Sequence, residues 1–312
     1  MTDKQDSNDE IQSISLKFQS FSTADPNLNP QEQSKITQPV PKMNISTSTH
    51  SLQDGKKSSV SDDNLPVRNL PELNLPEKII FVIDTVKEHD CTSFKLGTGA
   101  KYTPLFMIKR VVEIFVSAKS MLQRRHEFAL MTLDSQAAHW VCDFTSNVKS
   151  ILNYLDTITE DTLEEEQKTY DLGQAFEKIR THAHLPATGD SFVPPTFVTR
   201  VILIYSRSHC VPKFQTSDKD FEQLTENPYF FLDSLFVHEP PSSENKCDEA
   251  YAELTALDTK NFSYILEVGR NATKLHDNMA KLMAHPLQRP VQKDTCYTIH
   301  TSTTSQEVHT NV

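Results

Sequence analysis

Glycine is scarce in this chain, with only 6 among 312 residues. An average protein contains roughly 7% glycine, so the scarcity argues against glycine-rich folds and against loops that cradle phosphates. Basic residues are also in the minority, because 31 Lys and Arg stand against 42 Asp and Glu and give a formal charge of −11. Nucleic-acid-binding domains usually carry a basic excess, so we expect no direct nucleic-acid partner.

Long apolar runs are missing as well. The longest, such as 79–83 and 201–205, are far shorter than the roughly 18 residues of a membrane-spanning helix, so we expect no membrane partner. The N-terminus has neither the basic nor the apolar region of a secretory signal, and the 5 cysteines are scattered without a CxxC pair. Scattered cysteines without a secretory signal are typical of reduced thiols. We therefore expect a cytoplasmic and nuclear protein.

Composition divides the chain into three regions. Residues 1–75 are dominated by Ser, Thr, Gln, Asn, Asp and Pro. They cannot bury enough apolar surface to offset the entropy of ordering, so we predict a disordered N-terminal tail. Residues 76–290 combine apolar runs with amphipathic segments and form the predicted domain, and residues 291–312 are predicted to be a polar C-terminal tail.

The apolar runs of the domain predict its fold. Short β-branched runs at 78–84, 198–205 and 229–237 are typical of strands buried on both faces. The segments 127–133 and 139–144 predict an antiparallel hairpin, because about five residues between them cannot carry a parallel crossover. Other segments predict helices at 104–123, 148–158, 172–179, 218–225, 248–257 and 272–284, and a last strand at 262–268. This alternation predicts an α/β fold with a doubly wound, mostly parallel sheet and one antiparallel hairpin strand.

The first predicted helix has a clear apolar face. Apolar residues recur there at three- and four-residue spacings, which predicts the side that packs on the sheet. These residues are Ile108, Val111, Val112, Phe115, Ala118 and Leu122.

Four segments of the domain resemble one known family. They are 200–207, 227–233, 257–260 and 279–290, and the last runs for twelve residues without a gap. The chain resembles the von Willebrand A-like scaffold subunit shared by the BRISC and BRCA-one-A deubiquitinase complexes. The resemblance covers roughly residues 76–290 and leaves both predicted tails unmatched.

The resemblance implies a non-catalytic scaffold without a cofactor. In that family the protein holds together a complex with a JAMM zinc isopeptidase, an MPN-domain scaffold and a UEV-domain subunit. The complex cleaves lysine-sixty-three-linked polyubiquitin, with roles in ubiquitin signalling and the DNA-damage response. These partners and roles are expectations for this chain.

Metal-binding von Willebrand A domains supply a contrast. They use Asp-x-Ser-x-Ser after the first strand, a Thr from a second loop and an Asp after the fourth strand, all oxygen ligands that suit Mg²⁺. Here Asp84 takes the first position, but Val86 and Glu88 replace the serines, and Arg207 stands in the loop after the strand at 198–205. Asp84 and Thr169 therefore mark a vestigial metal position, and the favoured interpretation is that Asp84 caps the following loop.

Two other functions remain open at this point. One is a metal-dependent von Willebrand A interaction module. The other is a Rossmann-like enzyme, although 97–99 lacks the third glycine of a dinucleotide fingerprint and the chain has no Gly-Lys-Ser/Thr of a phosphate loop.

The segment after the last helix is the predicted partner-binding site. It consists of His285, Pro286, Leu287, Gln288, Arg289 and Pro290. Its two prolines predict an extended backbone that loses little entropy on binding, with Leu287 as an apolar anchor and Arg289 as a donor fork. The resemblance makes the UEV-domain subunit the expected receiver. The alternative is a simple helix stop, because proline commonly follows a helix end.

Overall fold

A computed structural model describes residues 70–163, 167–187 and 194–295. Its central sheet contains the parallel strands β1 (Glu77–Asp84), β5 (Glu127–Leu133), β9 (Val198–Tyr205), β11 (Phe230–Val237) and β12 (Ile265–Val268). The strand β6 (Ala138–Thr145) pairs antiparallel with β5, and the order across the sheet is β12-β11-β9-β1-β5-β6. The predicted fold, a von Willebrand A-like, doubly wound and mostly parallel sheet with one antiparallel hairpin strand, is confirmed.

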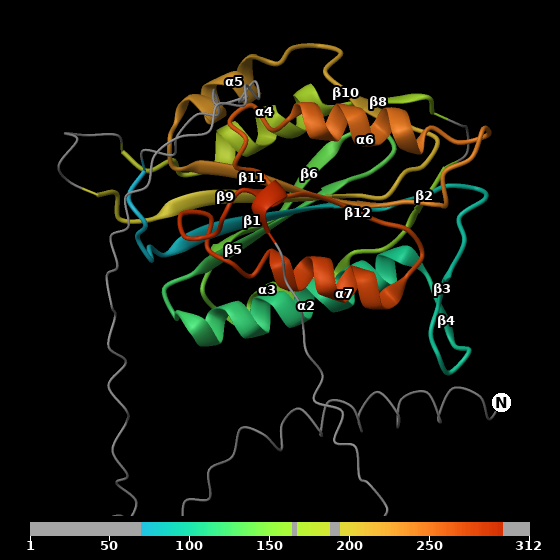
Figure 1. Ribbon diagram of the computed structural model, residues 1–312, viewed down its shortest axis with the longest axis horizontal. Coiled ribbons are helices and arrows are strands. Elements are labelled where there is room, and N and C mark those ends of the chain that lie inside the picture. Colours follow the sequence, from blue (N-terminus) through green and yellow to red (C-terminus); the bar gives the residue numbers. More distant parts are fainter. Residues whose placement is uncertain (1–69, 164–166, 188–193, 296–312) are drawn as a thin grey trace, which may run out of the picture. The chain divides into compact units, whose positions relative to one another are not determined.

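Helices cover both faces of this sheet (Figure 1). One layer contains α2 (Pro104–Leu122), α3 (Val148–Thr157) and α7 (Ala272–Lys281), and the other contains α4 (Leu172–His182), α5 (Lys219–Glu226) and α6 (Cys247–Ala256). Alternate residues of β1 serve the two layers, since Ile79 and Phe81 pack in the α2 layer and Ile80 and Val82 in the α4 layer. Burial on both faces explains the continuous apolar runs in the sequence.

Several short elements were not predicted. The strand β2 (Val86–Lys87) pairs with β7 (Asp161–Thr162), β3 (Phe94–Lys95) with β4 (Lys101–Tyr102), and β8 (Thr169–Asp171) with β10 (Val211–Lys213). A 3₁₀ helix, η1, spans Gln292–Asp294. Segments of two or three residues are too short to show a periodic pattern, so the sequence gives no signal for them.

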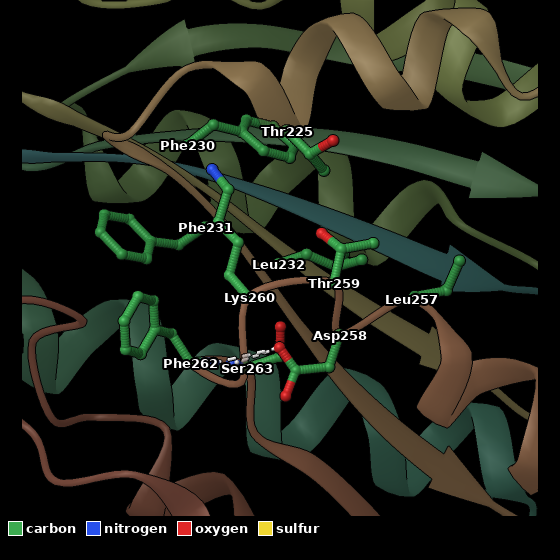
Figure 2. Close-up of a pocket in the computed structure, with 10 residues that line it drawn as sticks. All are labelled: Thr225, Phe230, Phe231, Leu232, Leu257, Asp258, Thr259, Lys260, Phe262 and Ser263. Atoms are coloured by element: carbon green, nitrogen blue, oxygen red, sulfur yellow. Dashed lines mark hydrogen bonds between the residues drawn. The ribbon is translucent and has the colours of Figure 1, made fainter. Parts of the chain in front are cut away.

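The last strand begins three residues later than the predicted start at 262. The carboxylate of Asp258 accepts hydrogen bonds from the backbone N–H groups of Phe262 and Ser263, at 3.1 Å each (Figure 2). Asn261, directly before Phe262, has a φ of 58°, in the left-handed region. This turn holds residues 258–263 out of the sheet, so pairing with β11 starts only at Ile265.

The helix α2 begins as predicted but buries a different set of residues at its end. The hydroxyl of Thr103 caps it by accepting from the N–H of Phe106, and Pro104 occupies the first turn. The prediction for Leu122 is wrong, because its side chain is 71% exposed while Lys119 is buried one turn earlier. A lysine thus occupies the sheet-facing side of the last turn, where its ammonium group contacts the buried carboxylate of Glu77.

The folded domain includes residues on both sides of the predicted range 76–290. Leu70, Leu73 and Leu75 pack partly buried against a small apolar cluster. At the other end, the Gln292 side chain donates to the carbonyl of Ile265 at 2.9 Å and accepts from its N–H at 2.6 Å. The rest of both predicted tails, 1–69 and 296–312, lies outside the described residues. Within the described part of the chain, each helix is too short or too polar to cross a bilayer.

Candidate functional site

The predicted metal position lies at the carboxyl ends of β1 and β9, where open α/β sheets bind ligands. The carboxylate of Asp84 is buried there and accepts from the Arg207 guanidinium, with Nε at 3.0 Å from Oδ1 and 3.2 Å from Oδ2. The N–H of Ser206 donates to Oδ2 at 3.0 Å, and the N–H of Val86 to Oδ1 at 3.3 Å. We call these four residues the Asp84 network. The predicted role of Asp84 as a cap is present in the Val86 contact, but its main partner is Arg207.

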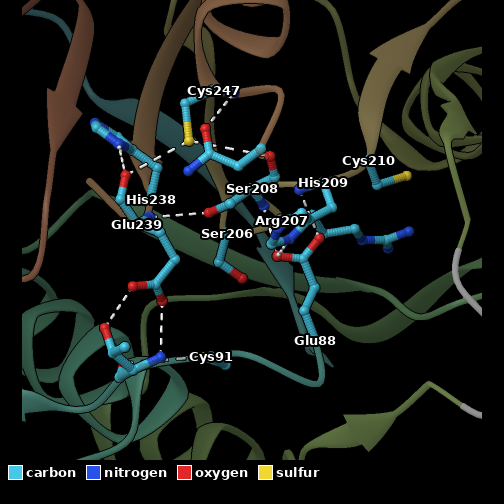
Figure 3. A network of polar contacts seen from close by, with 12 residues as sticks. Glu88, Cys91, Ser206, Arg207, Ser208, His209, Cys210, His238, Glu239 and Cys247 are labelled. Atoms are coloured by element: carbon cyan, nitrogen blue, oxygen red, sulfur yellow. Dashed lines mark hydrogen bonds and ion pairs between the residues drawn. The ribbon is translucent and has the colours of Figure 1, made fainter. Parts of the chain in front are cut away.

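A second set of hydrogen bonds connects the loops at the same carboxyl ends of the strands (Figure 3). Glu88, at the second serine position, accepts from the N–H groups of Ser208 at 2.7 Å and His209 at 2.9 Å. The hydroxyl of Ser208 accepts from the N–H of Glu239 at 2.9 Å, and the Glu239 carboxylate accepts from Arg270 NH2 at 2.6 Å. Carboxylates at this edge therefore bind protein donors within the chain.

The residues present do not fit a divalent cation. Both oxygens of Asp84 are engaged by Arg207 and backbone N–H groups, and Val86 has no side-chain ligand. Thr169 is exposed and accepts from the Gln215 side-chain amide at 2.8 Å, while its neighbour Tyr170 lies against the Arg207 guanidinium at 4.3 Å. Among the described residues no cluster of three His, Cys, Asp or Glu side chains could hold a metal ion.

Electrostatics keeps Arg207 charged in this position. Burial alone lowers the pKa of an arginine, but the adjacent Asp84 carboxylate raises the pKa of Arg207 above its ordinary value. The guanidinium thus supplies a permanent positive charge at the predicted metal position. This geometry disfavours the metal-dependent interaction module.

A pocket beside the Asp258 turn gives no support to the enzyme alternative (Figure 2). Its lining includes the titratable side chains of Asp258 and Lys260. The carboxylate of Asp258 accepts two backbone hydrogen bonds, and Lys260 Nζ donates to the carbonyl of Asn227 at 3.1 Å. Both groups therefore stabilise the turn, and the pocket contains no hydrogen-bonded pair of nucleophile and base.

The predicted partner-binding segment has a different conformation from the one expected. The N–H groups of Gln288 and Arg289 both donate to the carbonyl of His285, at 2.9 and 3.0 Å, so the segment forms a turn. The prediction of an extended, polyproline-like backbone is wrong. His285, Pro286, Leu287 and Arg289 are buried, and Gln288 and Pro290 are exposed.

Leu287 and Arg289 have partners inside the domain. Leu287 is 1% exposed and packs against Val198 and Phe231. Arg289 is 5% exposed, and its NH1 donates to Oδ2 of Asp233 at 2.9 Å while NH2 contacts Oδ1. Leu287 and Arg289, the predicted anchor and donor fork, thus bind within this chain, and a contact of this segment with a UEV-domain subunit stays a prediction.

Asp233 is the centre of a buried charge network near the other end of the sheet. It also accepts from Arg200 Nε at 2.7 Å, and Arg200 NH1 donates to Glu77 Oε2 at 3.1 Å. Lys119 Nζ lies 2.5 Å from Glu77 Oε1, which explains its burial at the end of α2. The chain of charges Lys119, Glu77, Arg200, Asp233 and Arg289 is called the Asp233 network, and it ties α2, three strands and the C-terminal turn together.

The pKa shifts fit this pairing. Burial raises the pKa of Asp233, but Arg289 and Arg200 outweigh it and hold the pKa below its ordinary value. Burial acts on Glu77 in the same way, and Arg200 and Lys119 lower the pKa of this carboxyl. Both acids are therefore charged in the folded protein at neutral pH.

Sequence reasoning missed the role of these residues. Arg200 and Asp233 stand inside runs predicted to be buried on both faces, and Glu77 directly precedes another such run, at 78–84. Charges of opposite sign within buried strands are the available signal, because buried charges are almost always paired. Without the sheet order, the sequence did not say which charge meets which.

His285 sits at the edge of the network as a neutral ring. Its Nδ1 accepts from the N–H of Leu287 at 3.1 Å, so Nε2 carries the proton and donates to the carbonyl of Leu75 at 3.0 Å. Burial lowers the pKa of His285 to about 4, with Glu77 opposing and Lys119 assisting the decrease. Burial also lowers the pKa of His126, whose Nδ1 accepts from the N–H of Glu77 at 2.9 Å.

Stability is therefore expected to fall as the pH drops below 6.5. The unfolded chain protonates its histidines near pH 6.5, whereas His285 in the folded protein resists until about pH 4. The unfolded state thus binds more protons across this window, and the free energy of unfolding decreases. Below about pH 4.5, Glu77 and Asp233, whose pKa values are lowered, add a further loss.

Urea denaturation at pH 7.5 and pH 5 checks this expectation. In His285→Gln the amide can accept and donate as the ring does but cannot titrate, so this variant should lose less stability than the wild type between the two pH values. An equal loss in both proteins would show that His285 does not carry the effect.

No protein-family model matches the chain. Solved structures similar to it include the VWA domain of SpRpn10, 11% identical over 70% of this chain and 99% of that chain with a TM-score of 0.41. Another is a von Willebrand factor type A protein from Catenulispora acidiphila, 11% identical over 68% of this chain and 43% of that chain with a TM-score of 0.44.

Curated relatives match more of the sequence. BRISC and BRCA1-A complex member 1 from Homo sapiens is 33% identical over 235 residues, which cover 73% of this chain and 70% of the relative. The protein of that name from Xenopus laevis is 32% identical over 233 residues, covering 73% of this chain and 69% of the relative. Identity of this extent over most of both sequences establishes common descent. The chain belongs to the family of BRISC and BRCA1-A complex member 1.

Proposed function

We propose that this chain is a non-catalytic scaffold subunit of a JAMM-type deubiquitinase complex specific for lysine-sixty-three-linked polyubiquitin. The observation that carries the proposal is the match to BRISC and BRCA1-A complex member 1 over 235 residues. The proposed partners are the UEV-domain subunit, the MPN-domain scaffold and the JAMM zinc isopeptidase. The proposed setting is ubiquitin signalling and the DNA-damage response, in the cytoplasm and the nucleus.

The two charge networks support a scaffold role. The predicted metal position is filled by Arg207, and the carboxylates around it bind donors of the same chain. Side chains that are committed to internal contacts hold surfaces in fixed relative positions but are not available for chemistry. A subunit that holds other chains together needs such fixed surfaces.

Most of the predicted partner-binding segment is buried in the structure. In the segment 285–290 only Gln288 and Pro290 are exposed. A partner that binds at this turn can contact only these two side chains. The rest of the interface has to be formed by other elements of the domain.

Affinity purification of the full chain tests the proposal. We expect mass spectrometry of the eluate to identify a JAMM isopeptidase with MPN- and UEV-domain subunits, and the eluate to cleave lysine-sixty-three-linked polyubiquitin. Absence of these subunits from the eluate would contradict the proposed function.

The isolated chain is expected to be inactive in the same assay. The described residues contain no group of three or more His, Cys, Asp or Glu side chains that could hold a metal ion, so the recombinant chain supplied with Zn²⁺ should leave polyubiquitin uncleaved. Cleavage by the chain alone, lost on addition of EDTA, would overturn the non-catalytic assignment.

A further inference from the structure

Exposed apolar side chains gather on the α2 layer. Among the described residues, the large apolar side chains that are exposed are Phe106, Ile114, Met121, Leu122 and Tyr154, four on α2 and one on α3. Met121 and Leu122 are by far the most exposed, at 77% and 71%. Single exposed apolar residues are ordinary, but two adjacent ones at a helix end form an apolar surface that water solvates poorly.

The fold does not need these two side chains. The C-terminal part of α2 packs on the domain through Val116 and Lys119, both buried. Lys119 Nζ also donates to the carbonyl of Met283 at 2.9 Å and so fixes the helix end beside the segment that follows α7. Met121 and Leu122 therefore project from a rigidly held position.

Two arginines follow directly on this surface. Arg124 and Arg125 lie in the turn after α2, are exposed, and make no ion pair with the described residues. Arg124 and Arg125 thus place two adjacent positive charges on the surface of a chain whose formal charge is −11. We call Met121, Leu122, Arg124 and Arg125 the α2 tip.

We propose that the α2 tip docks an acidic segment with apolar side chains from another subunit of the complex. This proposal rests on the function proposed above. Methionine and arginine are enriched in protein interfaces, and guanidinium groups bind carboxylates in a bidentate manner. The apolar pair would lose its water to apolar side chains of the partner, while the two arginines select a segment that carries Asp or Glu.

Surface variants test the proposal in the full chain. Met121→Glu with Leu122→Glu, and separately Arg124→Glu with Arg125→Glu, are expected to lower the recovery of the partner subunits at least tenfold in quantitative affinity purification. Their melting temperatures should stay close to the wild-type value, because the changed side chains are exposed. The matched control is Lys219→Glu with Gln223→Glu, exposed on α5 in the opposite layer, and it should retain full recovery.

Chemical cross-linking identifies the chemistry of the partner. The variant Arg124→Lys with Arg125→Lys keeps both charges and presents amines that a carbodiimide joins to carboxylates in direct contact. We expect these positions to be coupled to Asp or Glu of another subunit. Coupling only to this chain, or full recovery of all subunits by both glutamate variants, would overturn the proposal while the wild-type purification still supports the proposed function.

Two other occupants give different results. A second copy of this chain would appear as a wild-type dimer in sedimentation that Met121→Glu with Leu122→Glu makes monomeric. A membrane would appear as wild-type binding to vesicles of phosphatidylserine and phosphatidylcholine. Either result would contradict a subunit segment as the occupant, and loss of all partner subunits from the wild-type eluate would contradict the proposed function and this inference together.

Discussion

Replacing Arg289 with alanine is expected to lower the free energy of unfolding by about 3–5 kcal/mol. The substitution removes one of the two guanidinium groups that pair with Asp233, and the remaining carboxylate stays buried with incomplete compensation. It also removes the contact of the guanidinium with the Tyr264 ring, 3.9 Å from its centroid. Urea denaturation at neutral pH measures the loss directly.

The neighbours of Arg289 provide internal controls. Gln288→Ala changes an exposed side chain of the same turn and should alter stability by less than about 0.5 kcal/mol. Leu287→Ala removes a side chain that is 1% exposed and should cost about 2–5 kcal/mol. If Arg289→Ala and Leu287→Ala both kept wild-type stability while a UEV-domain subunit was lost, the segment would be a partner site as the sequence first indicated.

The second large effect is expected at Arg207. Arg207→Ala leaves the buried Asp84 carboxylate without its cation and should cost about 3–5 kcal/mol. Asp84→Ala should be similarly costly because it leaves the guanidinium unpaired. The double variant should cost less than the sum of the two single ones, with a coupling of about 0.5–3 kcal/mol.

Addition of Mg²⁺ distinguishes an Asp84–Arg207 ion pair from a working metal site at this position. With the guanidinium in place, Mg²⁺ should leave the melting temperature of the wild-type protein unchanged. A protein that binds Mg²⁺ in the folded state only is stabilised as its concentration rises. A clear increase in melting temperature with millimolar Mg²⁺, abolished by Asp84→Asn, would therefore show a working metal site.

The sequence predicts the sheet and its helices well because their signals are local. Residues 198–205 form a strand with the predicted bounds, since a short apolar run rich in β-branched residues is typical of a buried strand. The hairpin of β5 and β6 follows from the short connection between its strands. The structure differs from the prediction where contacts between residues distant in sequence determine the conformation.

Leu122 and Arg289 show what the sequence could not determine. The spacing of apolar residues in α2 places Leu122 on its apolar face. In the structure the buried Glu77 carboxylate binds Lys119, and Leu122 at the helix end is exposed to solvent. The prolines around Arg289 suggest an extended chain, but the pairing with Asp233, 56 positions away, holds a turn. Each outcome depends on a charge that is distant in sequence, which composition and period do not reveal.

The most direct test of the account is the integrity of the deubiquitinase complex without this chain. The complex is purified through its JAMM subunit from cells that contain or lack the chain, and its mass and its rate of lysine-sixty-three-linked polyubiquitin cleavage are measured. We predict a smaller, dissociating and less active assembly in its absence, restored by adding back the wild-type chain. An assembly of unchanged mass, less only this chain, with unchanged cleavage rate would contradict the scaffold function.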